Sequence, residues 1–182
     1  MKWLIYGSKG WIGGQVINIL DKCNETVICG KSRVDDTESV EKEVKAVCPD
    51  RVVSLIGRTH GPGFSTIDYL EQKGKLVENV RDNLFSPISL AIICQKMNIH
   101  FTYLGTGCIF TDACPEDTCG YNEDDLPNFT GSGYSTVKGF TDRLMHMFDD
   151  STLNVRIRMP IVGETNDRNF ITKISKYTKV VN

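Results

Sequence analysis

A hydroxyl and a thiol lie two residues apart near the middle of the chain, at Thr106 and Cys108 of the stretch YLGTGCIF. A hydroxyl can hydrogen-bond a carbonyl oxygen. A thiol has a reference pKa of about 8.5, and a cationic neighbour can lower that pKa enough for proton exchange near neutral pH. A buried cysteine is also simply a small apolar residue. The pair therefore indicates either acid–base chemistry at a strand end or ordinary packing there.

A tyrosine and a lysine lie four residues apart in the stretch GYSTVKGF. This spacing places Tyr134 and Lys138 on one face of a helix. A phenol has a reference pKa of about 10 and is a poor acid or base at neutral pH, but an adjacent ammonium group lowers that pKa. We therefore expect Lys138 to lower the pKa of Tyr134. The alternative is a surface pair with no chemical role.

Three glycines follow the first apolar run, in the stretch WLIYGSKGWIGG. Gly7, Gly10 and Gly13 permit a tight turn and a close approach of the backbone to a pyrophosphate, which the free N–H groups of the following helix then stabilise. A strand before this turn and a helix after it are typical of a dinucleotide site. Three more residues border the loop by position alone, and core packing would explain the last of them: Lys9, Trp11 and Ile12.

Basic and hydroxyl residues follow the second apolar run, in the stretch CGKSRVDD. An NAD site typically has an acidic residue here, which hydrogen-bonds the ribose 2′-hydroxyl. Lys31, Ser32 and Arg33 come first instead and suit a 2′-phosphate, so we expect NADPH rather than NADH. Asp35 and Asp36 keep NAD as the alternative. Without a cofactor, the same residues would form a solvated charged turn.

These residues follow predicted strands or begin predicted helices. Short β-branched runs alternate with amphipathic stretches, which is typical of βαβ units. The predicted strands are residues 3–6, 26–29, 51–55, 101–104 and 155–158, and the predicted helices are 11–22, 39–48, a pair within 74–97, and 134–148. The sequence therefore predicts a Rossmann-like α/β fold, a doubly wound parallel sheet with helices on both faces.

The composition is ordinary for a globular protein: 182 residues, 40% hydrophobic and 24% charged, with a formal net charge of -2. Such a charge gives no global attraction to nucleic acid or to an acidic membrane surface. No apolar stretch reaches the length of about 18 residues that a membrane span needs, and the first residues lack the apolar segment of a signal peptide. We expect a cytoplasmic protein that binds neither nucleic acid nor membranes.

The seven cysteines and three histidines show no metal-ligand spacing, so we expect no metal site. Reduced thiols suit such a scattered, odd set. Free cysteine behaves as a small hydrophobe. We therefore expect four of the cysteines to be packing residues: Cys23, Cys29, Cys48 and Cys94.

A long polar connection, residues 111–133, begins directly after the thiol at position 108 and is rich in Pro, Gly, Asp and Asn. Connections of this length within a domain are usually functional or disordered. We expect it to form a wall over a site that includes Cys108. The alternative is a surface insertion.

The order of these motifs matches a known family. A G-x-x-G-x-x-G turn, a Ser or Thr at a strand end and a Y-x-x-x-K pair follow one another, and the chain resembles the extended short-chain dehydrogenases/reductases over nearly its whole length. Within that family, the stretches LIYGSKGWIGG, TGCIF, PNFTGSGYSTVK, VRIRMPI and RNFITKISKYTKVVN look like those of the bifunctional 3,5-epimerase/4-reductases that complete UDP-L-rhamnose synthesis. The resemblance implies an NADP-binding Rossmann domain over residues 1–168 and the start of a substrate-binding region over residues 169–182.

The resemblance implies an NADPH-dependent conversion of UDP-4-keto-6-deoxy-glucose to UDP-L-rhamnose. In this reaction Tyr134 would donate a proton to the 4-keto oxygen and Thr106 would hydrogen-bond the same oxygen, while Lys138 would hold the nicotinamide ribose. Epimerisation at carbons 3 and 5 needs proton transfer on two faces of the sugar, which the resemblance assigns to Cys108 and Lys173. Which of these two is the base stays open.

The resemblance also implies that Asn169 contacts the nucleotide diphosphate and that two copies form a homodimer through the long helices. The stretch SLIGRTHGPG departs from the family pattern beneath the adenosine ribose and matches it at Gly57. Related enzymes have a further substrate-binding domain, so we expect a cofactor domain without its lid. Two other functions stay open: a simple nucleotide-sugar 4-keto reductase, and a non-catalytic nucleotide-binding regulatory subunit.

Overall fold

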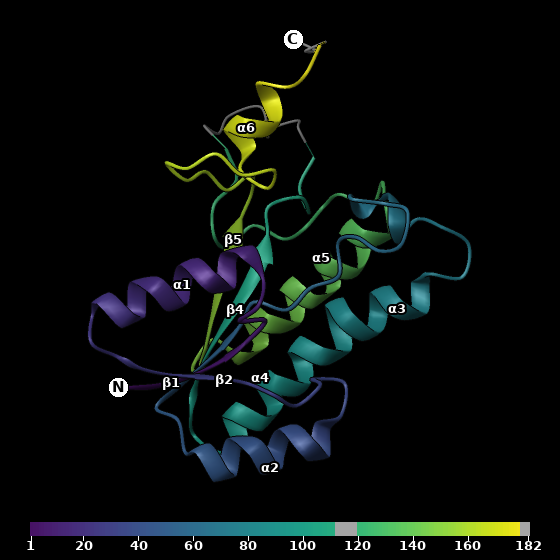
Figure 1. Ribbon diagram of the computed structural model, residues 1–182. Coiled ribbons are helices and arrows are strands. Elements are labelled where there is room, and N and C mark those ends of the chain that lie inside the picture. Colours follow the sequence, from purple (N-terminus) through teal and green to yellow (C-terminus); the bar gives the residue numbers. More distant parts are fainter. Residues whose placement is uncertain (112–119, 179–182) are drawn as a thin grey trace.

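The protein is built on a five-stranded parallel sheet, as the sequence predicts (Figure 1). The computed structural model describes residues 1–111 and 120–178. The strands are β1 (Lys2–Tyr6), β2 (Thr26–Cys29), β3 (Arg51–Ser54), β4 (His100–Thr106) and β5 (Thr152–Ile157), in the order β2-β1-β3-β4-β5. Because every neighbouring pair is parallel, the carboxyl ends of the strands share one edge of the sheet.

Helices cover both faces of this sheet, so the predicted fold class is confirmed. The helical elements are α1 (Trp11–Lys22), α2 (Thr37–Val47), η1 (Ile67–Tyr69), α3 (Leu76–Val80), η2 (Arg81–Phe85), α4 (Ser86–Lys96), α5 (Gly133–Met145), η3 (His146–Phe148) and α6 (Phe170–Ile174). α1 lies on one face, and α2, α4 and α5 lie on the other (Figure 1). α6 lies beyond the carboxyl edge of the sheet. No helix in the described ranges is both long and apolar enough to span a membrane.

The main core lies between the sheet and the face made by α2, α4 and α5. Alternate residues of a strand point to the same face. The large side chains buried there include Leu4, Tyr6, Leu90, Phe101 and Tyr103. Each side chain of this size contributes about 1.5–3 kcal/mol when it is buried, so this packing fixes the helices of that face against the sheet.

One continuous helical rod, residues 76–96, replaces the predicted pair of helices. α3, η2 and α4 follow one another without a break, and η2 is a π-helical turn. Such turns are frequent near functional sites. This one carries the buried Asn83, whose side chain accepts a hydrogen bond from the Arg58 N–H at 2.9 Å and donates one to the Arg58 carbonyl at 3.0 Å. The loop after β3 is thereby fixed to the rod.

The observed element boundaries differ from the predicted ones by up to three residues. β4 extends to Thr106 because its last residues still pair with β5, Gly105 with Arg156 and Thr106 with Ile157. Helix α2 begins two residues early, at Thr37, because the Asp36 carboxylate accepts the Ser39 N–H at 3.1 Å and caps it. The threonine singled out by the sequence is thus the last residue of its strand.

The prediction that four cysteines are packing residues is wrong for three of them. Cys94 on α4 is buried in the core, but Cys23, Cys29 and Cys48 are exposed. Cys23 and Cys48 follow the last turns of α1 and α2, and Cys29 ends the edge strand β2. Ends and edges of this kind face solvent, so a small apolar side chain there has nothing to pack into.

Candidate active site

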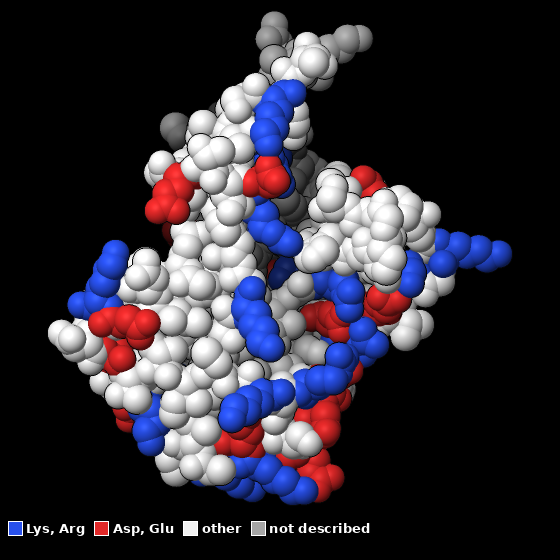
Figure 2. Space-filling model, in the orientation of Figure 1, with Lys and Arg blue, Asp and Glu red and all other residues white. Residues whose placement is uncertain are grey.

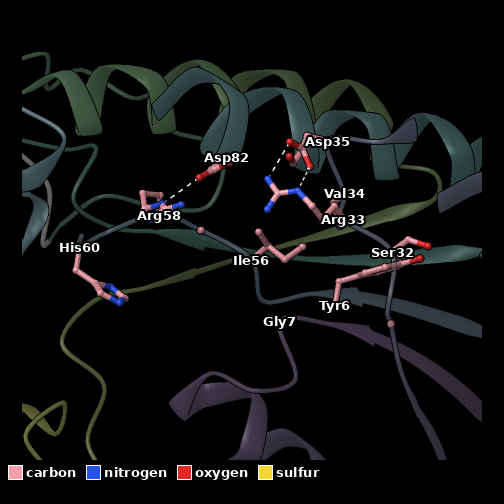
Figure 3. Close-up of a pocket in the computed structure, with 13 residues that line it drawn as sticks. Tyr6, Gly7, Ser32, Arg33, Val34, Asp35, Ile56, Arg58, His60 and Asp82 are labelled. Carbon is pink, nitrogen blue, oxygen red and sulfur yellow. Dashed lines mark hydrogen bonds and ion pairs between the residues drawn. The ribbon is translucent and has the colours of Figure 1, made fainter. Parts of the chain in front are cut away.

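The glycine loop and the loops after β2 and β3 enclose a cavity of about 320 Å³ at the carboxyl edge of the sheet. Strand order changes direction between β1 and β3, and ligands of open α/β sheets bind at such a switch point. The lining residues include four that the sequence singled out: Gly7, Ser32, Arg33 and Gly57. Figure 3 shows these segments approaching one another around the cavity.

The glycines allow close approaches that no other residue would permit. Gly7 has a φ of +85°, and a Cβ there would lie 2.8 Å from the carbonyl carbon of Leu55. A Cβ at Gly13 would lie 2.4 Å from the carbonyl oxygen of Gly7. Gly10 precedes α1 without a side-chain cap, and the first turn of α1 has no acidic residue. The free N–H groups of that turn therefore suit the diphosphate of a dinucleotide.

A glutamate on α2 holds the loop that follows β2. The Glu43 carboxylate accepts hydrogen bonds from the N–H groups of Lys31 and Ser32, at 2.7 and 3.0 Å, and from the Tyr6 hydroxyl at 2.9 Å. These bonds lower the pKa of Glu43 against the opposing effect of its partial burial. Glu43 was not singled out from the sequence, since nothing distinguishes it there from the other charged residues of an amphipathic helix.

Three arginines and two aspartates form an ion-pair network beside the cavity. Arg33 pairs with Asp35 at 2.9 Å and Arg58 with Asp82 at 3.0 Å, as drawn in Figure 3. Arg81 approaches both aspartates, at 3.6 and 2.7 Å. Hydrogen bonds from Arg81 and Arg58 outweigh the effect of burial and lower the pKa of Asp82. The three arginines exceed the two aspartates by one positive charge. Figure 2 shows Lys and Arg side chains interspersed with Asp and Glu on the face that it views.

A second group of residues lies where β4 ends. The Cys108 N–H donates to the Thr106 Oγ1 at 3.2 Å. The Thr106 hydroxyl and the Cys108 thiol both lie near enough to the phenol of Tyr134 to influence its pKa. Tyr134, the second residue of α5, is buried, while Cys108 is half-buried. Burial, and to a smaller degree the nearby thiol of Cys108, raises the pKa of Tyr134 to about 12. Three of the predicted catalytic residues therefore share one site.

The prediction that Lys138 lowers the pKa of Tyr134 is wrong for this structure. Lys138 is buried and donates its hydrogen bond to the Tyr103 hydroxyl, with its Nζ 4.6 Å from the centre of the Tyr103 ring. Burial lowers the pKa of Lys138 to about 8, and Asp142 opposes this shift. Tyr103 was missed by the sequence analysis. Its signal was the strand alternation that directs it toward the helix of Lys138.

The two residues predicted on the last segment lie apart from this group. Lys173 is exposed on α6, and its side chain has no hydrogen-bond or ion-pair partner among the described residues. Asn169 is buried and caps α6: it accepts from the Ile171 N–H at 3.2 Å and donates to the carbonyls of Val162 and Glu164. These bonds occupy its amide, so the contact to a nucleotide diphosphate stays a prediction.

The polar connection after Cys108 is fastened beside the site in its described part, residues 120–132. The N–H groups of Asn128 and Phe129 donate to the Ile109 carbonyl at 3.1 and 3.0 Å. Arg156 donates to the carbonyls of residues 122, 123 and 125 and pairs with the buried Asp142 at 2.7 Å. Residues 112–119 of the predicted wall lie outside the described residues. No metal-binding cluster occurs in the ranges 1–111 and 120–178.

The chain is similar to known proteins in sequence and in structure. No protein-family model matches the chain. It is 62% identical to protein L780 of Acanthamoeba polyphaga mimivirus, over 99% of this chain and 63% of that one. The crystal structure of L780, described as a UDP-rhamnose synthase, superposes with a TM-score of 0.94.

The chain also resembles a plant relative in sequence and a bacterial enzyme in fold. The chain is 39% identical to the trifunctional dehydratase/epimerase/reductase RHM1 of Arabidopsis thaliana, over its full length and 27% of RHM1. A dTDP-4-dehydrorhamnose reductase from Bacillus anthracis, solved with NADP, shares the fold at 17% identity, with a TM-score of 0.71 over 85% of this chain and 52% of that one. The chain spans less than two thirds of the length of each relative. It is a homologue of the L780 UDP-rhamnose synthase with the fold of the extended short-chain dehydrogenases/reductases.

Proposed function

We propose that the chain carries the cofactor site and the reductive centre of an NADPH-dependent 3,5-epimerase/4-reductase that converts UDP-4-keto-6-deoxy-glucose to UDP-L-rhamnose. The observation that carries this proposal is the grouping of Thr106, Cys108 and Tyr134 at the end of β4, within a chain 62% identical to L780. Residues 1–168 would form the cofactor domain, and residues 169–182 would begin the region that holds the sugar nucleotide.

The reductive half of the reaction uses Tyr134 and Thr106. The bound cofactor supplies a hydride to carbon 4 of the sugar. Tyr134 donates its proton to the 4-keto oxygen, so the ketone becomes an alcohol, and the Thr106 hydroxyl donates a hydrogen bond to that oxygen. A pKa of about 12 keeps the phenol protonated at neutral pH, as a general acid requires. Lys138 would hold the nicotinamide ribose when the cofactor is bound.

The epimerising half needs a group that removes a proton beside the ketone and a group that returns one to the opposite face. The assignment of Cys108 to one of these tasks is supported by the contact of its backbone N–H with Thr106 and by the influence of its thiol on the pKa of Tyr134. Lys173 is assigned to the other task by resemblance alone, since its ammonium lies exposed on α6. Either one can be the base.

The ion-pair network favours NADPH over NADH. A 2′-phosphate adds negative charge at the ribose, and the excess positive charge of Arg33, Arg58 and Arg81 over their two aspartates attracts it. Calorimetric titration of the chain with both cofactors tests this choice. Tighter binding of NADPH that is lost in Arg33→Ala supports it, and equal affinities contradict it.

A homodimer would cover an exposed apolar face of the long helices. The exposed apolar side chains are Phe85 on η2, Ile92 on α4, and Phe140 and Leu144 on α5. Both η2 and α4 contact α5. Exposed apolar side chains on adjoining helices would be covered by such an interface. Sedimentation analysis of the chain and of Phe140→Glu tests the proposal: a dimer dissociated by the substitution supports it.

The deciding experiment follows the reaction of UDP-4-keto-6-deoxy-glucose with NADPH in deuterated water by NMR. The proposal predicts a rhamnose product with deuterium at carbons 3 and 5, lost in Cys108→Ser and in Lys173→Ala. A sugar reduced at carbon 4 without deuterium at these carbons would leave the simple 4-keto reductase. Binding of NADPH without turnover would favour the regulatory subunit, against which the retained Thr106, Tyr134 and Lys138 argue.

A further inference from the structure

The first turn of α5, which carries Tyr134, is tied to a residue more than sixty positions earlier. The Glu71 carboxylate accepts the N–H of Gly133 at 2.8 Å through Oε2 and the N–H of Tyr134 at 3.0 Å through Oε1. Ser132 Oγ accepts the Ser135 N–H at 3.0 Å. Three N–H groups that a helix normally leaves without an internal partner are thereby satisfied, two of them by one carboxylate.

The segment before Glu71 packs on the Tyr134 side chain. Tyr69, Leu70 and Tyr134 form a separate buried apolar cluster. Tyr69 is itself fixed, because its hydroxyl donates to Glu78 at 2.8 Å and the ammonium of Lys75 lies 4.7 Å from its ring. The same short segment therefore contacts the catalytic tyrosine twice, at its ring and at its backbone.

The residue before Tyr134 has the size that this contact requires. A Cβ on Gly133 would lie 3.2 Å from Oε2 of Glu71, tighter than an ordinary contact. An added Cβ would require the carboxylate to shift by a few tenths of an ångström. Glu71 lies between η1 and α3, in the connection whose first residues border the cavity, and Tyr134 is in the first turn of α5, so the contact fixes the tyrosine relative to this connection.

We propose that Glu71 is a positioning residue for the catalytic tyrosine: by holding the N–H groups of Gly133 and Tyr134, it sets where the phenol lies against Thr106 and Cys108. Its effect on turnover rests on the proposed function. Its effect on the position of Tyr134 does not. A general acid displaced by about 1 Å can lose about a hundredfold in rate, so the contact acts on kcat more than on KM.

The test compares Glu71→Ala with Glu71→Gln, which keeps one of the two acceptor oxygens. The control is Val44→Ala, which removes buried volume from α2 outside the apolar cluster that contains Tyr134. One readout needs no substrate: amide exchange of Gly133 and Tyr134, with the ring resonances of Tyr134 assigned through Tyr134→Phe. The other readout is kcat and KM for reduction of the 4-keto sugar with NADPH.

In Glu71→Ala we expect both amides to exchange at least about tenfold faster relative to the rest of α5 and the Tyr134 ring resonances to move. We expect kcat to fall about ten- to a hundredfold, with KM within about threefold. Glu71→Gln keeps only one of the two acceptors, so it should give effects between those of the unaltered chain and Glu71→Ala, and Val44→Ala should show neither effect. Unchanged exchange and ring resonances in Glu71→Ala, or equal effects in Val44→Ala, would overturn the proposal. If the unaltered chain reduces no 4-keto sugar, the proposed function fails, and the exchange and ring measurements still decide the role of Glu71.

Discussion

Two helices, α1 and α5, begin near the carboxyl edge of the sheet. The N–H groups of the first turn lack side-chain partners in α1 and have them in α5. α1 follows Gly10 and has neither a side-chain cap nor an acidic residue in its first turn. α5 begins with its N–H groups bound by Ser132 and by the distant Glu71. Both turns offer the same donors and the same dipole, so the difference lies entirely in the residues around them.

The difference separates two tasks. An open helix start keeps its donors available for an anionic group, here the diphosphate of the cofactor. A closed start cannot bind an anion, but it holds the side chain at that position still, which a general acid needs. In this protein the glycine loop that leads into the open turn borders the cavity at Gly7, and the closed turn carries Tyr134.

The largest expected effect is a loss of cofactor affinity when a side chain is added at the start of α1. Gly13→Ala puts a Cβ 2.4 Å from the Gly7 carbonyl oxygen and 2.8 Å from that of Ser8, so the loop must move. We expect the affinity for NADPH to fall at least about a hundredfold, measured by calorimetry. Gly14→Ala is the matched control, because a Cβ there meets open space. It should keep the affinity and stabilise the helix by about 0.5–1 kcal/mol; equal losses in both variants would contradict the steric account.

The buried ammonium of Lys138 on α5 predicts that the stability of the protein depends on pH. Burial lowers the pKa of Lys138 to about 8, whereas a lysine in an unfolded chain has a pKa of about 10.4. Between these values the unfolded chain binds more protons, so the contribution of Lys138 to stability increases as the pH rises. Relative to Lys138→Met, the chain should gain roughly 1–3 kcal/mol between pH 8 and pH 10.

Urea unfolding of both proteins at each pH measures this gain. Comparison with the variant removes the contribution of Cys94, whose pKa burial raises to about 12 and which acts in the opposite direction in both proteins. A difference between the proteins that stays constant from pH 7 to pH 10 would show that the lysine is not buried as described.

A smaller effect is expected when α1 receives the kind of acceptor that α5 already has. Gly10→Asp provides a carboxylate for the free N–H groups of the first turn, and it should stabilise the chain without cofactor by about 0.5–1 kcal/mol. The same carboxylate competes with the diphosphate, so the affinity for NADPH should fall about tenfold. Melting curves with and without cofactor measure the two effects. A gain in both stability and affinity would contradict the account.

The smallest effect is expected when one cap is removed from α5. Ser132→Ala loses the acceptor for the Ser135 N–H and should cost about 1 kcal/mol of stability. Because Glu71 still holds the preceding N–H groups, the affinity for NADPH should be unchanged. Thermal unfolding and calorimetry on the same samples check both statements, and a loss of affinity comparable to that in Gly10→Asp would remove the distinction between the helices.

The sequence predicted the parts of this site whose signals are local. The glycine turn and the Tyr134–Lys138 spacing depend on neighbours within one helix turn, and the parallel sheet follows from alternating periodicity. Glu71, Tyr103 and Asn83 were missed because each acts on a partner 25 to 63 residues away. The pKa of Tyr134 was predicted in the wrong direction for the same reason: spacing placed an ammonium beside the phenol, whereas packing directs that ammonium to Tyr103 and leaves burial to dominate.

The most direct test of the contrast between the two helices is a titration of the isotope-labelled chain with inorganic pyrophosphate, followed through backbone amide resonances. We predict that the N–H signals of Trp11, Ile12 and Gly13 move with pyrophosphate concentration, while those of Gly133 and Tyr134 stay in place. Equal movement at both helices, or movement at α5 alone, would contradict the assignment of α1 as the open, anion-binding start and of α5 as the closed one.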